Sequence, residues 1–203
     1  MKSRALKIAE DILQMEREFF QLSKRHTGII HAHSELWCAE NFGLDLPQSG
    51  VSSGADGIAS SDLFFPLQKG DRIQIKGRGD LTMHVTFKPY AVDWLMIVTY
   101  DITVSPVRIC AYLYKVSDLT ACAQIFKEQA GKPVIPLKFT PKGDLRLEWN
   151  VMKSKRFGKV VRSKDTWDAR HQRFSILWAK GYQYIDGKFK LNSDKTSILN
   201  NFS

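Results

Sequence analysis

The run Trp94–Tyr100 (WLMIVTY) constrains the fold of this chain most, because it is apolar almost throughout. Residues of this kind favour a strand, and a strand that lacks a polar face has to be covered on both sides. The segment Arg108–Tyr114 is also rich in residues that favour strands. The two segments predict a central sheet with further layers packed against it.

Helices are expected on either side of these strands in the chain. Three segments have helical character: residues 2–24, with apolar side chains at near-helical spacing, Ile30–Phe42, and Ser117–Gln129. Gly43 suits the C-terminal cap of the second helix, and Ser117 suits the N-cap of the third. The sequence therefore predicts an α/β protein in which helices flank a central mixed sheet.

Shorter strands are expected around a turn at Lys69-Gly70-Asp71. This turn separates Leu63–Leu67 from Arg72–Lys76, which predicts a β-hairpin whose first arm is an edge strand, since it contains a proline. Leu81–Phe87 is a further candidate strand, and Leu145–Trp149 is expected to be the last strand of the chain.

The length of 203 residues suggests one domain, or one domain with an appendage. Residues 1–150 are expected to form the core, and residues 151–203 a basic extension packed on the same domain. No apolar run approaches the roughly 20 residues of a membrane span, and charges interrupt the N-terminal segment where a signal peptide would be apolar. Three widely spaced cysteines form no metal or disulfide framework, so a cytoplasmic protein is expected.

Positive charge is concentrated in the last quarter of the chain. Residues 151–203 hold 12 Lys and Arg against 4 Asp and Glu, and so account for nearly all of the net charge of +9. A polyanion such as DNA is one partner that this charge predicts. A basic segment that serves only solubility is the alternative, and charge alone does not separate the two.

Two carboxylates are candidates for chemistry. Glu35 shares one face of the predicted helix with small or apolar residues, which predicts that it points inward, where a lone carboxylate is costly unless paired or metal-bound. Asp56 lies between Gly54-Ala55 and Gly57, which allows a tight backbone turn around it. The plain alternatives are that Glu35 lies at the edge of the packed face or pairs with an Arg, and that Asp56 caps its own turn.

Gln74 and Lys76 are spaced to lie on one face of the predicted strand, while Ile73 and Ile75 point to the other face. Taken alone, the pair is better explained as the exposed polar face of an edge strand. Together with Asp56 and Glu35, it would provide carboxylate and amide oxygens for a hard cation such as Mg²⁺, and a lysine beside the phosphate under attack.

These residues, in the order Glu35, Asp56, Gln74-Ile75-Lys76, resemble the PD-(D/E)xK nuclease superfamily with its restriction-endonuclease fold. The run HSELWCAENFGLDL…SSGADG…DRIQIKGR is similar to Mrr-like endonucleases and to small bacterial members with a Gln-x-Lys strand. The likeness covers roughly residues 28–150. Ala55 replaces the proline of the motif's name, and Gln74 replaces the usual acidic residue, which leaves two carboxylates.

The resemblance implies an endonuclease that hydrolyses DNA phosphodiester bonds with Mg²⁺ or Mn²⁺, in a setting of restriction or defence. It assigns metal binding to Glu35, Asp56, Gln74 and the Ile75 carbonyl. It implies that Lys76 holds the attacking water. Duplex cutting commonly takes two active sites, so a homodimer is compatible with it. Basic residues that would contact phosphates are Arg78, Lys153, Lys155, Arg156, Lys159 and Arg162.

Two other interpretations remain open. One is a catalytically silent nucleic-acid-binding protein on the same fold, which the uncharged Gln74 favours. The other is a structural or partner-binding protein whose basic segment serves a different anionic surface.

Overall fold

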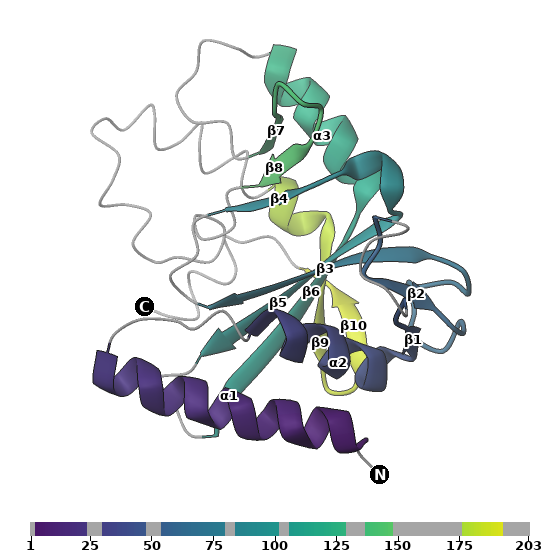
Figure 1. Cartoon of the computed structure of the whole chain (residues 1–203). Helices are drawn as coiled ribbons and strands as arrows, with labels where there is room; N and C mark the ends of the chain where they lie inside the picture. The colour runs from purple at the N-terminus through teal and green to yellow at the C-terminus, as the bar shows by residue number, and fades with distance from the viewer. Residues whose placement is uncertain are drawn as a thin grey trace.

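The protein is described from a computed structural model that covers residues 3–23, 30–47, 54–79, 84–101, 106–128, 137–147 and 176–192 (Figure 1). Its labelled helices are α1 (Arg4–Ser23), α2 (Ile30–Phe42), the 3-10 turn η1 (Pro89–Ala91) and α3 (Val116–Glu128), and residues 176–179 are helical as well. Within these ranges, no helix combines the length and the hydrophobicity that a bilayer crossing takes.

The larger sheet runs through the middle of the molecule. Its seven strands among the described residues are β1 (Leu44–Asp45), β2 (Gly57–Ala59), β3 (Arg72–Gly79), β5 (Trp94–Asp101), β6 (Arg108–Lys115), β9 (Gly181–Ile185) and β10 (Lys188–Leu191). They lie in the order β1-β2-β3-β5-β6-β9-β10, and the pairing is parallel between β3 and β5 and antiparallel elsewhere. The protein is therefore an α/β protein with a mixed sheet.

Strand β5 lies at the centre of this sheet, as its apolar sequence predicts. Seven of its eight residues, Trp94 to Tyr100, are buried. Leu95 and Ile97 point into a core shared with α3, whereas Met96 and Val98 point into a core shared with α2. The strand has no polar face because helices cover both of its faces (Figure 1).

A second, smaller sheet packs beside α3. It consists of β4 (Val85–Phe87), β7 (Leu137–Phe139) and β8 (Leu145–Leu147), in the order β4-β8-β7 among the described strands. Val85, Leu137, Leu145 and Leu147 turn their side chains into the core around α3. Because β4 comes between β3 and β5 in the chain, the connection between these two parallel strands passes through the small sheet.

Most of the predicted elements are confirmed, and three details are wrong. The partner of Arg72–Lys76 is Gly57–Ala59, not Leu63–Leu67, where the chain turns at Phe65-Pro66. Helix α3 begins at Val116, so Ser117 is inside the helix rather than its N-cap. Leu145–Leu147 is not the last strand of the chain, since β9 and β10 follow it.

Candidate functional site

The site forms where the pairing between β2 and β3 stops. Strand β2 pairs with β3 only at Arg72 and Ile73, so the edge of β3 is left without a strand partner from Gln74 onward among the described residues. Asp56, directly before β2, donates its backbone N–H to the Ile73 carbonyl at 2.9 Å. This hydrogen bond places the Asp56 side chain against the open edge of β3.

One oxygen of Asp56 binds this edge through several contacts. Asp56 Oδ2 accepts the backbone N–H of Ile75 at 2.8 Å and the side-chain amide of Gln74. Lys76 Nζ lies 3.8 Å from the same oxygen, and both side chains are about three-quarters buried. Since Gln74 and Lys76 share one face of β3 while Ile73 and Ile75 are in the core behind it, the predicted alternation is confirmed.

Glu35 approaches the same edge from helix α2. Gly77 makes this approach possible, because a Cβ at that position would lie 2.6 Å from Ser34 Oγ and 2.8 Å from the Ile30 carbonyl oxygen. The helix therefore packs directly on the backbone of β3. One residue after Ser34, the Glu35 side chain is half-buried and close enough to Asp56 and Lys76 for their charges to act on it.

Among the side chains that the structure describes, negative charge exceeds positive charge at this edge. Burial and the nearby Asp56 carboxylate raise the pKa of Glu35 above its ordinary value, and the ammonium of Lys76 opposes them. These two carboxylates thus share Lys76 at a partly buried site. An added cation would relieve the repulsion between them.

This arrangement predicts how stability depends on pH. A raised pKa means that the folded state holds the Glu35 proton more tightly than the unfolded chain does, so ionising Glu35 costs stability. The cost is absent below the ordinary value of 4.5 and grows as the pH rises through it. Glu35→Gln is therefore expected to melt at a higher temperature than the wild type at about pH 7.5, and at a similar temperature at about pH 3.5.

Thermal denaturation at the two pH values, without divalent cations, measures this difference. Glu18→Gln, which changes an exposed glutamate on α1, is the matched control. A Glu35→Gln variant that is less stable than the wild type at neutral pH would contradict the charge repulsion described above.

A hollow of about 350 Å³ opens beside Asp56 and Gln74. Its opposite wall belongs to the small sheet and the segments next to it, and the residues on that wall are Thr86, Phe87, Lys88 and Asp144. Sequence reasoning missed this wall. The strands β4 and β8 have three residues each and lie far apart in the chain, so the sequence carries no local signal that they pair. Nothing therefore indicated that Thr86 or Asp144 would face Asp56.

The donor set suits a hard cation such as Mg²⁺. Asp56 Oδ1 has no hydrogen-bond partner among the described residues, Glu35 supplies a second carboxylate, and Gln74 keeps its carbonyl oxygen because its amide nitrogen faces Asp56. The Ile75 N–H points to Asp56, and in a strand the carbonyl of the same residue leaves on the same side. In the described ranges, no three His, Cys, Asp or Glu side chains gather as a metal-binding group, so amide and carbonyl oxygens would have to complete this site.

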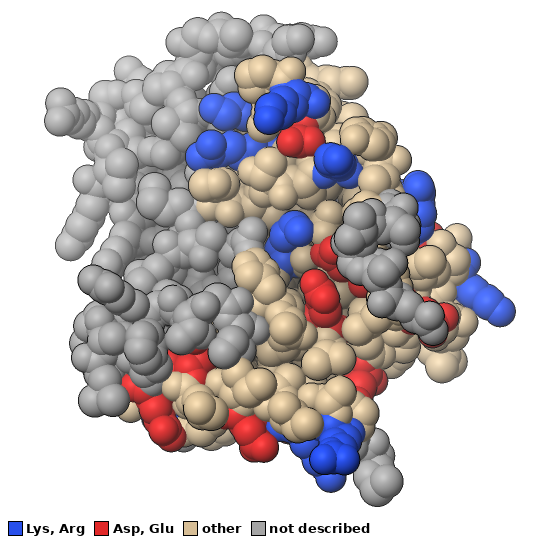
Figure 2. All heavy atoms as spheres, in the orientation of Figure 1, with Lys and Arg blue, Asp and Glu red and all other residues tan. Residues whose placement is uncertain are grey.

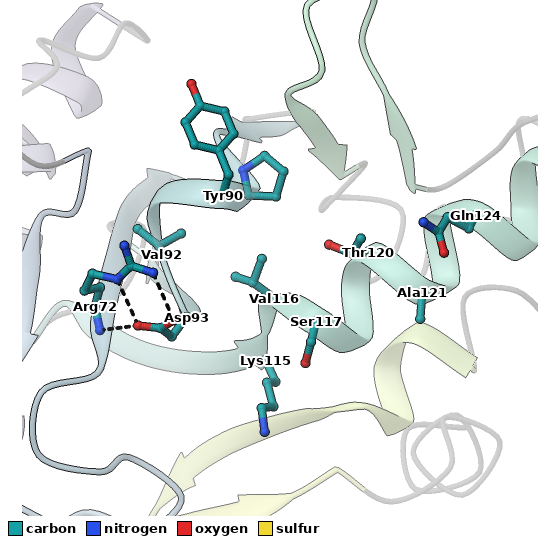
Figure 3. A pocket seen from close by; sticks show the side chains of 11 residues that line it. Arg72, Tyr90, Val92, Asp93, Lys115, Val116, Ser117, Thr120, Ala121 and Gln124 are labelled. Atoms are coloured by element: carbon teal, nitrogen blue, oxygen red, sulfur yellow. Dashed lines mark hydrogen bonds and ion pairs between the residues drawn. The ribbon is translucent and has the colours of Figure 1, made fainter.

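A larger hollow, of about 450 Å³, lies at η1 and the start of α3 and contains none of the predicted site residues (Figure 3). On one side of it, Arg72 donates its backbone N–H and two guanidinium N–H groups to Asp93, at 2.9–3.2 Å. These hydrogen bonds hold the pKa of the Asp93 carboxyl below its ordinary value. The ion pair ties the first residue of β3 to the residue just before β5, which supports the parallel register of the two strands.

The structure brings together the four predicted catalytic residues, Glu35, Asp56, Gln74 and Lys76, at one strand edge. Arg78 belongs to β3, but its side chain lies outside what the structure describes. The basic residues Lys153, Lys155, Arg156, Lys159 and Arg162 also lie outside the described residues. The predicted contacts of these cations with phosphates therefore stay predictions.

Two comparisons with known proteins leave the chain without an assigned family. No protein-family model matches it, and no curated protein matches it.

Proposed function

We propose that this protein is a Mg²⁺-dependent endonuclease that hydrolyses DNA phosphodiester bonds, built on a restriction-endonuclease-like core. The observation that carries the proposal is the convergence of Glu35, Asp56, Gln74 and Lys76 at the open edge of β3. The hollow, which Asp56 and Gln74 line, would give a phosphate access to these two residues. The resemblance of the same residues to the PD-(D/E)xK pattern supports the proposal independently of the geometry.

Each residue has a distinct task in this proposal. Asp56, Glu35, the Gln74 amide oxygen and the Ile75 carbonyl would hold Mg²⁺, which supplies a Lewis acid and lowers the pKa of an attacking water. The Lys76 ammonium would orient that water and offset the negative charge that develops around the phosphorus. The Ile75 N–H and the Gln74 amide fix the Asp56 carboxylate in position, so that little reorganisation is needed during the reaction.

One observation favours the alternative of a catalytically silent DNA-binding protein. Asp56 Oδ2 already faces three donors, from Gln74, Ile75 and Lys76, so this oxygen is satisfied without a metal. In the silent protein, Asp56 would only tie the start of β2 to β3.

Metal binding and cleavage separate the two functions. The wild type is expected to bind Mg²⁺ or Mn²⁺ in calorimetry, to melt at a higher temperature in their presence, and to cut supercoiled plasmid or single-stranded DNA. The metal should lose its stabilising effect in Asp56→Asn, which keeps a hydrogen-bond acceptor for the Ile75 N–H but lacks the charge. If the wild type binds no metal and leaves both DNAs intact, the silent function is correct and the nuclease is not.

A further inference from the structure

The small sheet has one apolar face and one polar face. The apolar face packs on α3 through Val85, Phe87, Leu145, Leu147 and Leu137. On the opposite face, the register pairs Thr86 with Arg146, and Arg146 with Lys138. These three side chains, which we name the basic row, therefore lie side by side across the three strands.

The basic row begins at the candidate site. Thr86 lines the hollow that Asp56 and Gln74 line from the other side. Lys88 and Asp144, the next residues along the same face, line the hollow as well. The row thus leads from the hollow, through Arg146, to the exposed Lys138.

Basic side chains lie over the small sheet, and acidic ones lie near the site. Figure 2 shows several Lys and Arg side chains, with an acidic side chain among them, in the region where Figure 1 places β7, β8 and α3, while Asp and Glu side chains adjoin a basic one nearer to α2. An acidic centre suits a cation, and the basic surface next to it suits the anion that would approach that cation. The fixed charges therefore match a phosphate chain that crosses the small sheet and enters the hollow.

We propose that the basic row is a binding track for the DNA backbone, which holds phosphates on one side of the scissile phosphate. Neighbouring strands lie about 4.8 Å apart, so the row extends roughly 10 Å from Thr86 to Lys138. The Thr86 hydroxyl donates to a phosphate oxygen near the hollow, and Arg146 and Lys138 neutralise the phosphates beyond it. Such contacts position DNA without reading its sequence.

Lys88 and Asp144 set the near end of the track. Asp144 is a half-buried carboxylate that would repel a phosphate, and the exposed Lys88 on the same wall offsets it. The DNA backbone is therefore held more tightly along Arg146 and Lys138 than at the hollow itself. This arrangement keeps the scissile phosphate accessible to the residues of the opposite wall.

The location of the scissile phosphate rests on the proposed nuclease function, but the binding itself does not, so binding is tested without cleavage. A fluorescent DNA duplex is titrated with the full-length protein in EDTA over a series of NaCl concentrations. Each lost phosphate contact reduces the slope of log K against log salt by about 1. The double variant Arg146→Gln/Lys138→Gln is therefore expected to bind more weakly, with a slope smaller by about 2.

The control is Lys7→Gln/Lys69→Gln, which removes the same charge from exposed positions on α1 and in the turn before β3. Its slope should equal that of the wild type, and so should the slope of the exchange variant Arg146→Lys/Lys138→Arg. Lys138→Gln alone changes an exposed side chain, so it tests the track, with a slope smaller by about 1, even if the double variant does not fold.

Equal slopes in the track variants and in the control would overturn the proposal, and so would tighter binding of an RNA duplex of the same sequence. If the slopes change as expected but the protein never cuts DNA with Mg²⁺, the binding track is supported and the nuclease function is excluded. If the protein cuts DNA but the track variants show no change of slope, the nuclease function is supported and the binding track is excluded.

Discussion

Replacing Asp56 with alanine is expected to reduce Mg²⁺-dependent DNA cleavage to the background level, and Lys76→Ala to reduce it about 10²–10³-fold. The Asp56 carboxylate accepts hydrogen bonds from Gln74 and Ile75 and forms an ion pair with Lys76. Its loss removes one of the two charges that would hold the metal. Lys76→Ala leaves the metal ligands in place and removes only the positive charge near the reacting phosphate. Rates of plasmid nicking measure both effects.

Each variant has a matched control in the same sheet or next to it. Asp45→Ala removes an exposed aspartate from β1, and Lys69→Ala removes an exposed lysine from the turn before β3. Both controls should cut DNA at the rate of the wild type. Equal rates in Asp56→Ala, Lys76→Ala and the wild type would exclude this site as the source of any cleavage.

Asp56→Ala also affects folding, so its stability has to be measured beside its activity. It leaves the N–H of Ile75 without its acceptor, and a donor that loses its partner in a buried place costs about 1–3 kcal/mol. Asp56→Asn keeps an acceptor at this position and separates the two effects. It is expected to fold nearly as stably as the wild type and still to lack Mg²⁺-dependent cleavage.

The second large effect is expected at Gly77, where α2 touches the backbone of β3. In Gly77→Ala the new methyl group would overlap Ser34 and the backbone of Ile30, so the helix has to move outward. Such overpacking lowers the free energy of unfolding by about 1–3 kcal/mol. Because Glu35 moves with the helix, cleavage is also expected to fall, by up to about 10²-fold for a shift of 1 Å.

Gly57→Ala is the matched control, since a methyl group on this buried glycine of β2 would make only ordinary contacts, at 3.4 Å from Leu44. Urea denaturation should show a much smaller change for Gly57→Ala than for Gly77→Ala. If Gly77→Ala retains the stability and the metal affinity of the wild type, the close packing of α2 on β3 does not position Glu35.

The parts of the fold with strong local patterns are predictable from the sequence. The uninterrupted apolar run of β5 is a buried central strand, and Ile30–Phe42 is a helix that ends at Gly43, whose φ of 60° is readily adopted by glycine. The alternation along Gln74-Ile75-Lys76 also gives the correct side for each residue. In these segments one short stretch of sequence contains the whole signal.

Other features depend on contacts that no local pattern records. The segment Leu63–Leu67 is apolar enough for a strand, yet Leu63 and Phe65 are 83% and 73% exposed, and the antiparallel partner of β3 is the three-residue strand β2. The wall of the hollow that carries Lys88 and Asp144 exists only because β4 pairs with β8. The proximity of Glu35 to Lys76 was suggested by resemblance, and its physical cause is the missing side chain at Gly77.

The crossover from β3 through β4 to β5 determines how this protein can be divided. A fragment that ends before Leu137 would retain Glu35, Asp56, Gln74 and Lys76, but it would lack β7 and β8 and leave β4 without its partner strand. A fragment that ends before Gly181 would expose the edge of β6 that pairs with β9. Leu13 of α1 belongs to the core that α2 and β3 share, so removing α1 would expose that core as well. The smallest piece of chain worth expressing to study this site therefore runs from α1 to β10, although the four residues themselves span only Glu35 to Lys76.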